Sequence, residues 1–315
     1  MTKAERGAWV AEKFRDPDVT AGGEPRAVVP LERLDTLWFN TGTLCNITCA
    51  NCYIESSPVN DRLAFVTAAE VRGFLEEIER ERLGTRRIGF TGGEPFVNPD
   101  ILAMFEQCLS RGFEVLVLTN AMQPMVRWGD RLAALAGGYR DALVVRVSID
   151  HYRRALHEKE RGERTWEPML RGVRWLMDNG FRISVAGRTC WGEDERSLRE
   201  GYGRLFAQLG VDVDAWDPEG LVLFPEMDEL ADVPEITAGC WAKLGKSPSE
   251  VMCSNSRMVV KRKGADGPVV LACTLIAYDE RFEMGATLAE ARRAVVLNHT
   301  HCSRFCVLGG GACVR

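Results

Sequence analysis

Three cysteines, Cys45, Cys49 and Cys52, lie close together in the chain in a C-x3-C-x2-C pattern. They follow the apolar run 37–40 and the turn-forming residues 41–43, which predicts a loop that leaves a β-strand. Cysteine thiolate is the usual ligand of iron–sulfur clusters, and three thiolates this close can share one inorganic centre. A four-iron cluster takes four ligands, so three cysteines leave one iron open. In zinc proteins, an open coordination position distinguishes catalytic sites from structural ones. By analogy, an iron without a protein ligand indicates a cluster that can bind a cofactor or substrate.

The spacing disfavours the commoner uses of cysteine. Zinc sites usually present paired cysteines followed by a second pair of cysteines or histidines, and the chain has four histidines, none near this loop. Eleven cysteines in 315 residues, behind a start that lacks the apolar core of a signal peptide, do not predict a disulfide framework. Three buried structural cysteines are the remaining alternative, and chance rarely places three on one polar turn.

A second motif, Gly92-Gly93-Glu94-Pro95, follows a predicted strand at 87–91. Glycine lets a backbone approach a ligand closely. Alone the motif is a weak signal, because glycine pairs mark many turns and the glutamate could simply be solvated.

Together, the cysteine triplet and the Gly-Gly-Glu-Pro segment resemble the radical S-adenosylmethionine (SAM) enzymes, in order and spacing, from about residue 37 to residue 188. The resemblance implies a [4Fe-4S] cluster on the triplet, with its open iron chelated by the amine and carboxylate of SAM. It also implies reductive cleavage of SAM to a 5'-deoxyadenosyl radical that abstracts a substrate hydrogen. The sequence departs from the family at Asn51, where an aromatic residue is common, which leaves Tyr53 or another ring to cover the adenine.

The resemblance also implies a cofactor pocket at the ends of the strands. It assigns Gly92, Gly93 and Glu94 to the methionine amine, with Glu94 offering a complementary charge. Further polar residues end the next strands, and from them we expect Ser148 to hold the ribose and Arg188 to grip the carboxylate. Plain strand-end caps are the alternative, and Asp150 could bond the loop that it starts. The set is Thr119, Asn120, Ser148, Asp150 and Arg188. No residue is assigned to direct catalysis.

Several other polar residues carry weaker signals. A basic run follows the fourth predicted strand, and solvated charge is its favoured interpretation, with contact to an anionic substrate beside His151 and His157 as the alternative. The run comprises Arg153, Arg154, Lys159, Arg161 and Arg164. Cys108 lies among apolar residues at helical spacing and predicts a core position. Cys190 is expected to be a bystander thiol.

Composition restricts the class of protein. The chain has 46% hydrophobic and 27% charged residues, as soluble globular proteins do, and a net charge of −5. This charge disfavours a nucleic acid partner, whose phosphates require clustered Lys and Arg. No stretch approaches the roughly 18 apolar residues of a membrane span. Free thiols and an oxygen-sensitive cluster fit a reducing cytoplasm.

The pattern of elements predicts an α/β fold. From Leu37 to Phe224 apolar runs alternate with amphipathic ones, which indicates six strand–helix units and a parallel sheet. Six units form a partial (β/α)6 TIM-like barrel, in which catalytic groups collect at the carboxyl ends of the strands. The predicted organisation is an N-terminal arm at 1–34, a barrel at 35–226 and a cysteine-rich extension at 227–315. Expected details include a capping box at Thr67, a helix closed by Gly137-Gly138, and a cap at Thr165.

The extension predicts a small metal-held unit, because it has many cysteines and few core formers. Runs at 258–261 and 269–271 indicate a β-hairpin, and Thr287-Leu-Ala-Glu290 a short capped helix. The order of its cysteines resembles the SPASM and twitch extensions of this superfamily, which carry auxiliary clusters. Gly267 lies one residue further from the next cysteine than usual, and the cysteines are too few for two clusters, which favours the twitch type. A structural zinc site is the alternative. The expected ligands are Cys253, Cys273, Cys302 and Cys306, with Cys313 a close competitor and Cys240 less favoured.

These features predict a radical SAM oxidoreductase with an auxiliary [4Fe-4S] cluster, reduced by a flavodoxin- or ferredoxin-type partner. Oxidation or dehydrogenation of a small molecule is the favoured net reaction. Oxidation or cross-linking of a ribosomal peptide is the first alternative, and an activase that installs a radical on a partner enzyme is the second. A plain electron-transfer or metal-binding module is the least favoured.

Overall fold

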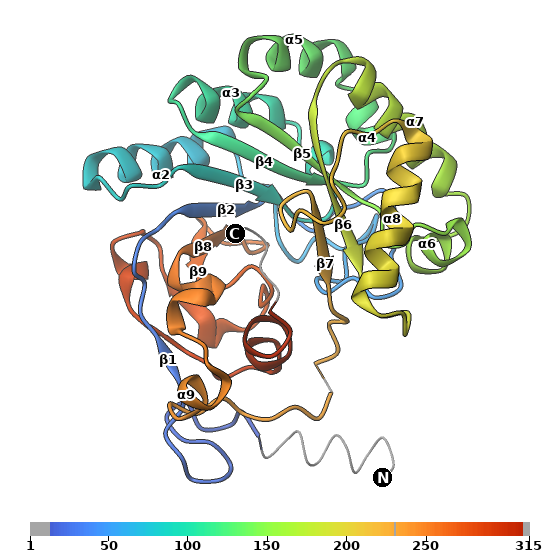
Figure 1. Ribbon diagram of the computed structural model, residues 1–315. Coiled ribbons are helices and arrows are strands. Elements are labelled where there is room, and N and C mark those ends of the chain that lie inside the picture. The colour runs from blue at the N-terminus through green and yellow to red at the C-terminus, as the bar shows by residue number, and fades with distance from the viewer. Residues whose placement is uncertain (1–12, 230, 311–315) are drawn as a thin grey trace.

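A nine-stranded sheet organises the computed structural model, which describes residues 13–229 and 231–310 (Figure 1). Its strand order is β10-β9-β8-β2-β3-β4-β5-β6-β7. The strands from β2 to β7 run parallel in sequence order, so each one lies next to its predecessor. They are β2 (Thr36–Asn40), β3 (Arg87–Thr91), β4 (Glu114–Thr119), β5 (Leu143–Ser148), β6 (Arg182–Arg188) and β7 (Leu221–Phe224). The predicted six-unit partial barrel is confirmed.

Helices connect these strands and lie along the outer side of the fan that they form (Figure 1). They are α2 (Ala68–Glu81), α3 (Ile101–Ser110), α4 (Gln123–Val126), α5 (Gly129–Tyr139), α6 (Arg154–Arg161), α7 (Trp166–Asp178) and α8 (Glu195–Leu209). Aromatic side chains fill the space between sheet and helices: Phe39 stacks on Phe90, and Phe90 meets Phe105 edge-on, with ring centroids 5.7 and 5.1 Å apart. Edge-on and offset ring pairs add to the stabilisation that apolar burial provides.

Local signals explain most of the helix ends. Thr67 and Glu70 form the predicted capping box at the start of α2. Two expectations were wrong. Gly137-Gly138 lie inside α5 and do not end it, and the Thr165 hydroxyl donates to the Gly162 carbonyl and does not cap α7.

The cysteine-rich extension shares the barrel's sheet. Its predicted hairpin is present as β8 (Ser256–Val260) and β9 (Val269–Leu271), and β8 also pairs in parallel with β2. The third strand, β10 (Glu283–Gly285), pairs with β9. The predicted boundary near residue 226 therefore separates two stretches of sequence that share one sheet.

The remaining elements of the extension are short. The helix expected at Thr287 is a single 3-10 turn, Glu290–Arg292, although the Thr287 and Glu290 side chains do make the capping contacts. From the N-terminal arm, β1 (Val28–Val29) pairs with β11 (Val295–Val296), so the arm packs on the extension. The other elements are α9 (Cys240–Leu244), a π-helix at Cys302–Val307, and 3-10 turns at Pro95–Val97, Pro248–Glu250, Met252–Ser254 and Glu280–Phe282.

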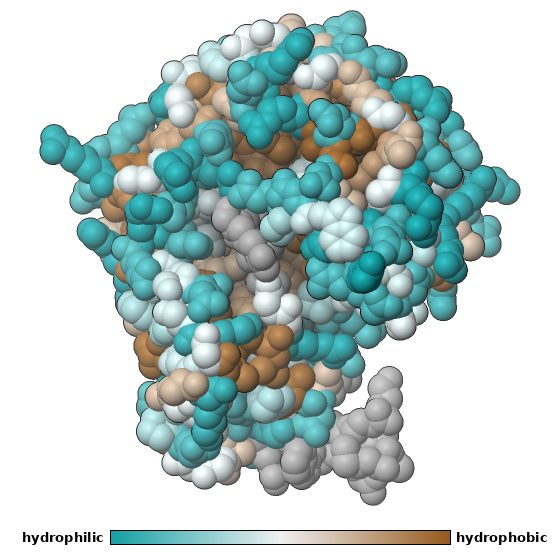
Figure 2. Space-filling view, in the orientation of Figure 1, coloured by the Kyte–Doolittle hydropathy of each residue, from teal (hydrophilic) through white to brown (hydrophobic). Residues whose placement is uncertain are grey.

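Hydrophilic side chains cover most of the face shown in Figure 2, with hydrophobic residues visible inside the arc of helices and over the extension. None of the helices in the described part of the chain has the length and apolar character that crossing a membrane requires.

Candidate active site

A pocket lies at the carboxyl ends of the barrel strands and reaches the extension. The space between its walls, including open solvent at its mouth, is about 1150 Å³. Every barrel residue predicted for cofactor or cluster binding lines it except Glu94. Those residues are Cys45, Cys49, Cys52, Tyr53, Gly92, Gly93, Thr119, Asn120, Ser148, Asp150 and Arg188.

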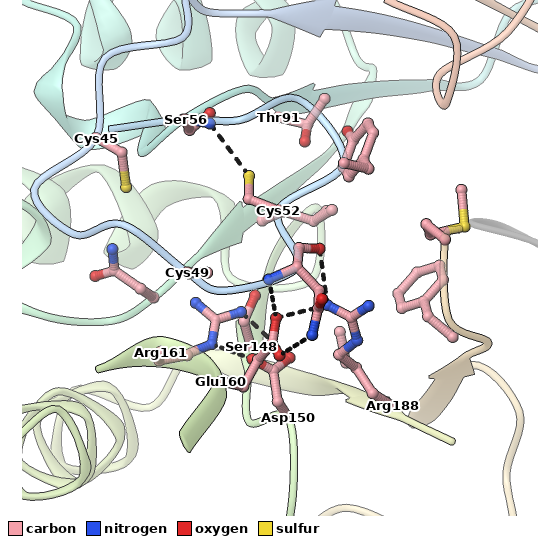
Figure 3. A pocket seen from close by; sticks show the side chains of 18 of the residues that line it. Cys45, Cys49, Cys52, Ser56, Thr91, Ser148, Asp150, Glu160, Arg161 and Arg188 are labelled. Atoms are coloured by element: carbon pink, nitrogen blue, oxygen red, sulfur yellow. Dashed lines mark hydrogen bonds and ion pairs between the residues drawn. The ribbon is translucent and has the colours of Figure 1, made fainter. Parts of the chain in front are cut away.

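The cysteine loop is fixed at both ends by the main chain. The Cys45 N–H donates to the Ser57 carbonyl, and the Ala50 N–H donates to the Glu160 carbonyl at the end of α6. The Ser56 N–H lies 3.3 Å from the Cys52 sulfur. Figure 3 shows the three cysteines along this loop, with Arg161 and Glu160 beside it. The loop is therefore ordered by contacts within the chain.

Burial suppresses ionisation of the first two thiols. It raises the pKa of Cys45 to about 12 and that of Cys49 to about 11. A neighbouring Arg161 charge acts in the opposite direction on both thiols. Because thiolate is the form that binds metal, metal must displace a proton from each of these cysteines.

The two glycines after β3 permit a close approach to the cysteine loop. Gly92 has a φ of +138°, and a Cβ there would lie 2.6 Å from the Gly42 carbonyl oxygen. A Cβ on Gly93 would overlap the Leu44 carbonyl. The N–H of Gly93 donates to the Gly42 carbonyl and that of Glu94 to the Leu44 carbonyl. The structure thus gives the Gly-Gly pair a definite function, which is to join β3 to the cysteine loop.

The Glu94 side chain lies beneath the pocket wall and is 2% exposed. Its carboxylate accepts hydrogen bonds from the Thr119 hydroxyl and from the Asn120 and Phe96 N–H groups. Burial raises its pKa to about 7 against these hydrogen bonds. In the described structure Glu94 binds the ends of β3 and β4 together, and its predicted contact with an amine stays a prediction.

Arg161 is the main residue that the sequence did not reveal. It lines the pocket, and its Nε lies 2.6 Å from Asp150 Oδ2, although we expected a solvated charge. Burial lowers the pKa of its guanidinium, but Asp150 and the neighbouring Cys49 outweigh this effect and raise the pKa overall. The charge of the run hid this position, because Arg161 shares its helix face with the buried His157 and Glu160, whereas the nearest basic residues, Lys159 and Arg164, are exposed. The other Arg of the site, Arg188, is ion-paired with Glu160 at 2.8 Å.

Two of the four favoured tail ligands are buried and the other two, Cys273 and Cys306, are partly exposed. Cys253 and Cys302 are buried, and a charge on Cys273 would raise the pKa of both, which places the three sulfurs in close electrostatic range. Cys302 and Cys306 lie almost one turn apart in the π-helix, a form often found at functional sites. Cys313 lies outside the described residues. Cys240, the less favoured candidate, contacts Thr237.

The tail adjoins the pocket. Thr274 and Leu275, directly after Cys273, line it. Phe224 at the end of β7 also lines it and stacks on Phe305 of the π-helix, with centroids 5.6 Å apart. The extension therefore contributes to the wall of the pocket that the cysteine triplet lines.

No site for a single metal ion is preformed in the described part of the chain. Within 13–229 and 231–310, no three His, Cys, Asp or Glu side chains converge around one point as a lone metal ion requires. Zinc holds its ligands at about 2.0–2.3 Å, which demands such convergence. Cysteine thiolate is the usual ligand of iron–sulfur clusters, so the triplet remains the candidate ligand set for such a cluster.

Comparison with known proteins identifies the family. A family model described as the radical SAM superfamily matches residues 39–200, just over half of the chain. The chain is a member of the radical SAM superfamily. Members of this superfamily bind a [4Fe-4S] cluster and SAM, as the resemblance implied.

Curated relatives cover parts of this radical SAM chain. The antilisterial bacteriocin subtilosin biosynthesis protein AlbA of Bacillus subtilis is 27% identical over 169 residues, which are 53% of this chain and 35% of AlbA. A GTP 3',8-cyclase of Tolumonas auensis is 30% identical over 145 residues, 44% of this chain and 39% of the cyclase. The chain thus spans well under half the length of both relatives.

Solved structures share the fold over a longer stretch. Streptococcus suis SuiB bound to precursor peptide SuiA has a TM-score of 0.60 at 12% identity, covering 82% of this chain and 63% of SuiB. anSMEcpe with bound AdoMet and Kp18Cys peptide has a TM-score of 0.58 at 14% identity, covering 85% of this chain and 82% of that one. The likeness extends beyond the barrel into the extension.

Proposed function

We propose that this chain is a radical SAM oxidoreductase that acts on a side chain of a peptide. The observation that carries the proposal is the single pocket onto which the triplet, the strand ends and the tail loop all open. Cys45, Cys49 and Cys52 would hold the cluster that binds SAM, and when bound these groups supply reductive cleavage of SAM and a 5'-deoxyadenosyl radical. Hydrogen abstraction from a substrate in the same pocket follows from this arrangement.

The polar strand ends support a site for SAM. Gly92 and Gly93 leave the pocket wall free of side chains beside the loop. Thr119, Asn120 and Ser148 line it as well, with the Thr119 hydroxyl donating to Glu94 and the Asn120 amide donating to Asn46. Hydroxyls and amides of this kind suit the ribose. Arg161 and Arg188 are the cations available for a carboxylate, each already balanced by an acidic neighbour.

The apolar wall supports the substrate assignment. Phe224, Pro225, Met227 and Leu275 line the side of the pocket towards the extension. Such a surface fits an uncharged side chain delivered on a longer chain better than it fits a small polar metabolite. The proposal agrees with the precursor peptide SuiA bound to SuiB, with the Kp18Cys peptide bound to anSMEcpe, and with the part of AlbA in subtilosin biosynthesis.

The tail supports net oxidation. Cys253, Cys273, Cys302 and Cys306 would hold an auxiliary cluster next to the apolar wall, and this cluster would supply an electron acceptor when bound. The substrate would lose one hydrogen atom to the deoxyadenosyl fragment and one electron to the tail centre, and would release a proton as its new bond forms. Cluster potentials cover a wide range, which permits this direction of electron flow. A flavodoxin- or ferredoxin-type protein would provide the first electron.

A small-molecule substrate is the second candidate, because GTP 3',8-cyclases are among the curated relatives. Labelling distinguishes the two. The anaerobically reconstituted protein is incubated with SAM, dithionite and either a library of deuterated peptides or deuterated GTP. Deuterium in 5'-deoxyadenosine from the peptide alone supports the proposal, and deuterium from GTP alone overturns its substrate assignment. A Cys49→Ala variant that still makes 5'-deoxyadenosine would contradict the cluster assignment.

Iron content tests the tail. With each cluster taken as [4Fe-4S], wild type should hold about eight irons and a Cys45→Ala/Cys49→Ala/Cys52→Ala variant about four. About four in wild type and none in the variant would return the tail cysteines to zinc or to structure, and would favour a redox-neutral reaction.

A further inference from the structure

Glu160, the next-to-last residue of α6, makes a concentrated set of contacts with the cysteine loop. Its carbonyl accepts from the Ala50 N–H at 2.7 Å. One carboxylate oxygen accepts from the Asn51 N–H at 3.0 Å, and the other from the Asn51 side-chain amide at 2.8 Å. One glutamate thus binds both residues that separate Cys49 from Cys52.

Arg188 completes the arrangement from the end of β6. A single Nη1 donates to Glu160 Oε1 at 2.8 Å and to the Asn51 carbonyl at 3.1 Å. The Glu160 side chain is 1% exposed and that of Arg188 is 11% exposed. Charge-assisted hydrogen bonds are stronger than neutral ones, and burial strengthens them further.

This set gives a physical account of the asparagine that departs from the family pattern. Asn51 directs its amide to Glu160 and away from the role of an aromatic ring. A phenylalanine ring could not donate to the buried carboxylate, which would lose a hydrogen bond. Asn51 and Glu160 are therefore complementary in this chain.

We propose that Glu160, Asn51 and Arg188 form a latch in which Glu160 is a positioning residue that fixes the segment between Cys49 and Cys52. The latch acts through Asn51 and through the Ala50 main chain, and so sets where the last two thiols of the triplet lie relative to the pocket. Changes to residues that orient metal ligands typically cost about 10- to 100-fold in metal affinity or activity. This inference rests on the proposed function only in assigning the triplet to the cluster.

Reciprocal substitution tests the latch. Glu160→Gln removes the charge that pairs with Arg188 and replaces one of the two acceptor oxygens by an amide donor. Asn51→Asp places a carboxylate against Glu160, so each single change weakens the set of contacts. The double variant Asn51→Asp/Glu160→Gln restores one donor facing one acceptor and keeps the net charge. Glu163→Gln is the matched control, since Glu163 is exposed two residues beyond the helix end.

We expect Glu160→Gln to cut the rate of 5'-deoxyadenosine formation by about 10-fold or more, with recovery of at least about half of the loss in the double variant. Two further readouts do not depend on turnover. Hydrogen exchange at the Ala50 and Asn51 amides should accelerate in Glu160→Gln and slow again in the double variant. The EPR spectrum of the reduced SAM-bound cluster should shift and then return.

The outcomes are separable. If the wild type makes no 5'-deoxyadenosine, the proposed function fails, while hydrogen exchange still reports on the latch. If the wild type is active and Glu160→Gln matches it in rate, exchange and EPR spectrum, the latch is overturned. A double variant no better than the worse single variant, with iron content and melting temperature equal to wild type, overturns it as well. If Glu160→Gln does not fold, hydrogen exchange at the Ala50 amide is measured in Asn51→Asp. Faster exchange than in wild type supports the latch, and unchanged exchange overturns it.

Discussion

The chain builds two cysteine sites in opposite ways. The triplet takes its ligands from one loop, and contacts from α6, β3 and β6 hold that loop at the wall of an open pocket. The tail cysteines come from segments far apart in sequence, and two of them, Cys253 and Cys302, are buried. A local site on an ordered loop can leave a coordination position open to substrate. An enclosed site made of distant segments instead ties its own surroundings together.

A buried arginine accompanies each site, and the two differ in their partners. Arg161 beside the triplet pairs with the carboxylate of Asp150. Arg257 beside the tail cysteines donates to the main-chain carbonyls of Cys253, Ser256, Ala291 and Arg293. Burial lowers the pKa of Arg257 to about 10, against the effect of the nearby thiols. The charge of Arg161 is thus neutralised by a carboxylate, whereas the charge of Arg257 is stabilised by main-chain carbonyl dipoles.

Removing one cysteine from each site should give the largest contrast. Cys49→Ala should abolish 5'-deoxyadenosine formation and change the melting temperature by about 2 °C or less, because the thiol lies on a loop that the chain itself orders. Cys273→Ala should retain this activity within a few-fold and lower the melting temperature by about 5–10 °C, since a metal-held core loses a ligand. Product chromatography and calorimetry measure the two effects. The reverse pattern would mean that the tail is the reactive site.

A glycine-to-alanine change in each region should show which glycine is required by a close backbone contact. Gly93→Ala should lower 5'-deoxyadenosine formation by about 100-fold, because the Cβ overlaps the Leu44 carbonyl and pushes β3 from the cysteine loop. Gly267→Ala in the tail hairpin meets nothing within 4 Å and should change the free energy of unfolding by about 0.5 kcal/mol or less. Equal effects at both positions would refute the tight junction at Gly93.

Stability lost on removing Arg161 should be recoverable by a second substitution in its partner, whereas stability lost on removing Arg257 should not. Arg161→Met should cost about 3–5 kcal/mol in the free energy of unfolding, because it leaves Asp150 buried and unpaired. Asp150→Asn/Arg161→Met should recover much of that loss, whereas the partners of Arg257 are carbonyls that no substitution removes. Urea denaturation measures both variants. Arg154→Met serves as the control, since its exposed pair with Glu158 is worth about 1 kcal/mol or less.

The smallest expected effect is the pH dependence that Glu94 contributes to the barrel. Its pKa of about 7 lies above the ordinary value of 4.5, so the folded chain holds this proton more tightly than the unfolded chain does. The contribution is complete below about pH 4.5 and is lost as pH rises through about 7. The stability difference between wild type and Glu94→Gln should therefore change between pH 5 and 7 and level off above it, when measured by denaturation at each pH. A constant difference would exclude a proton on Glu94.

The residues that line the barrel site were largely predictable from the sequence, because short stretches of the chain determine their positions. Strand ends, the Gly-Gly pair and the triplet are fixed by short stretches, and parallel strands bring their ends to one edge, so Thr119 and Ser148 could be placed in one pocket. Glu160 and Arg161 could not be found this way. They lie in a charged run whose other members face solvent, and only the packing of α6 on the cysteine loop turns these two inward.

In the extension the sequence predicted the hairpin but not its place in the sheet. Apolar alternation around Gly267 indicates two paired strands, yet it contains no information about a third partner. The pairing of β8 with β2 joins residues separated by more than 200 positions, and tertiary packing alone decides it.

The pairing of β8 with β2 also determines when the sheet can be completed during synthesis and folding. During synthesis β2 has β3 on one side and an open edge on the other until β8 emerges, and an open edge can pair with other chains. Contacts so distant in sequence also slow folding, because a long loop must close before they form. The loop that carries the triplet begins directly after β2, so the strand that positions it gains its second neighbour only when the hairpin of the extension is in place.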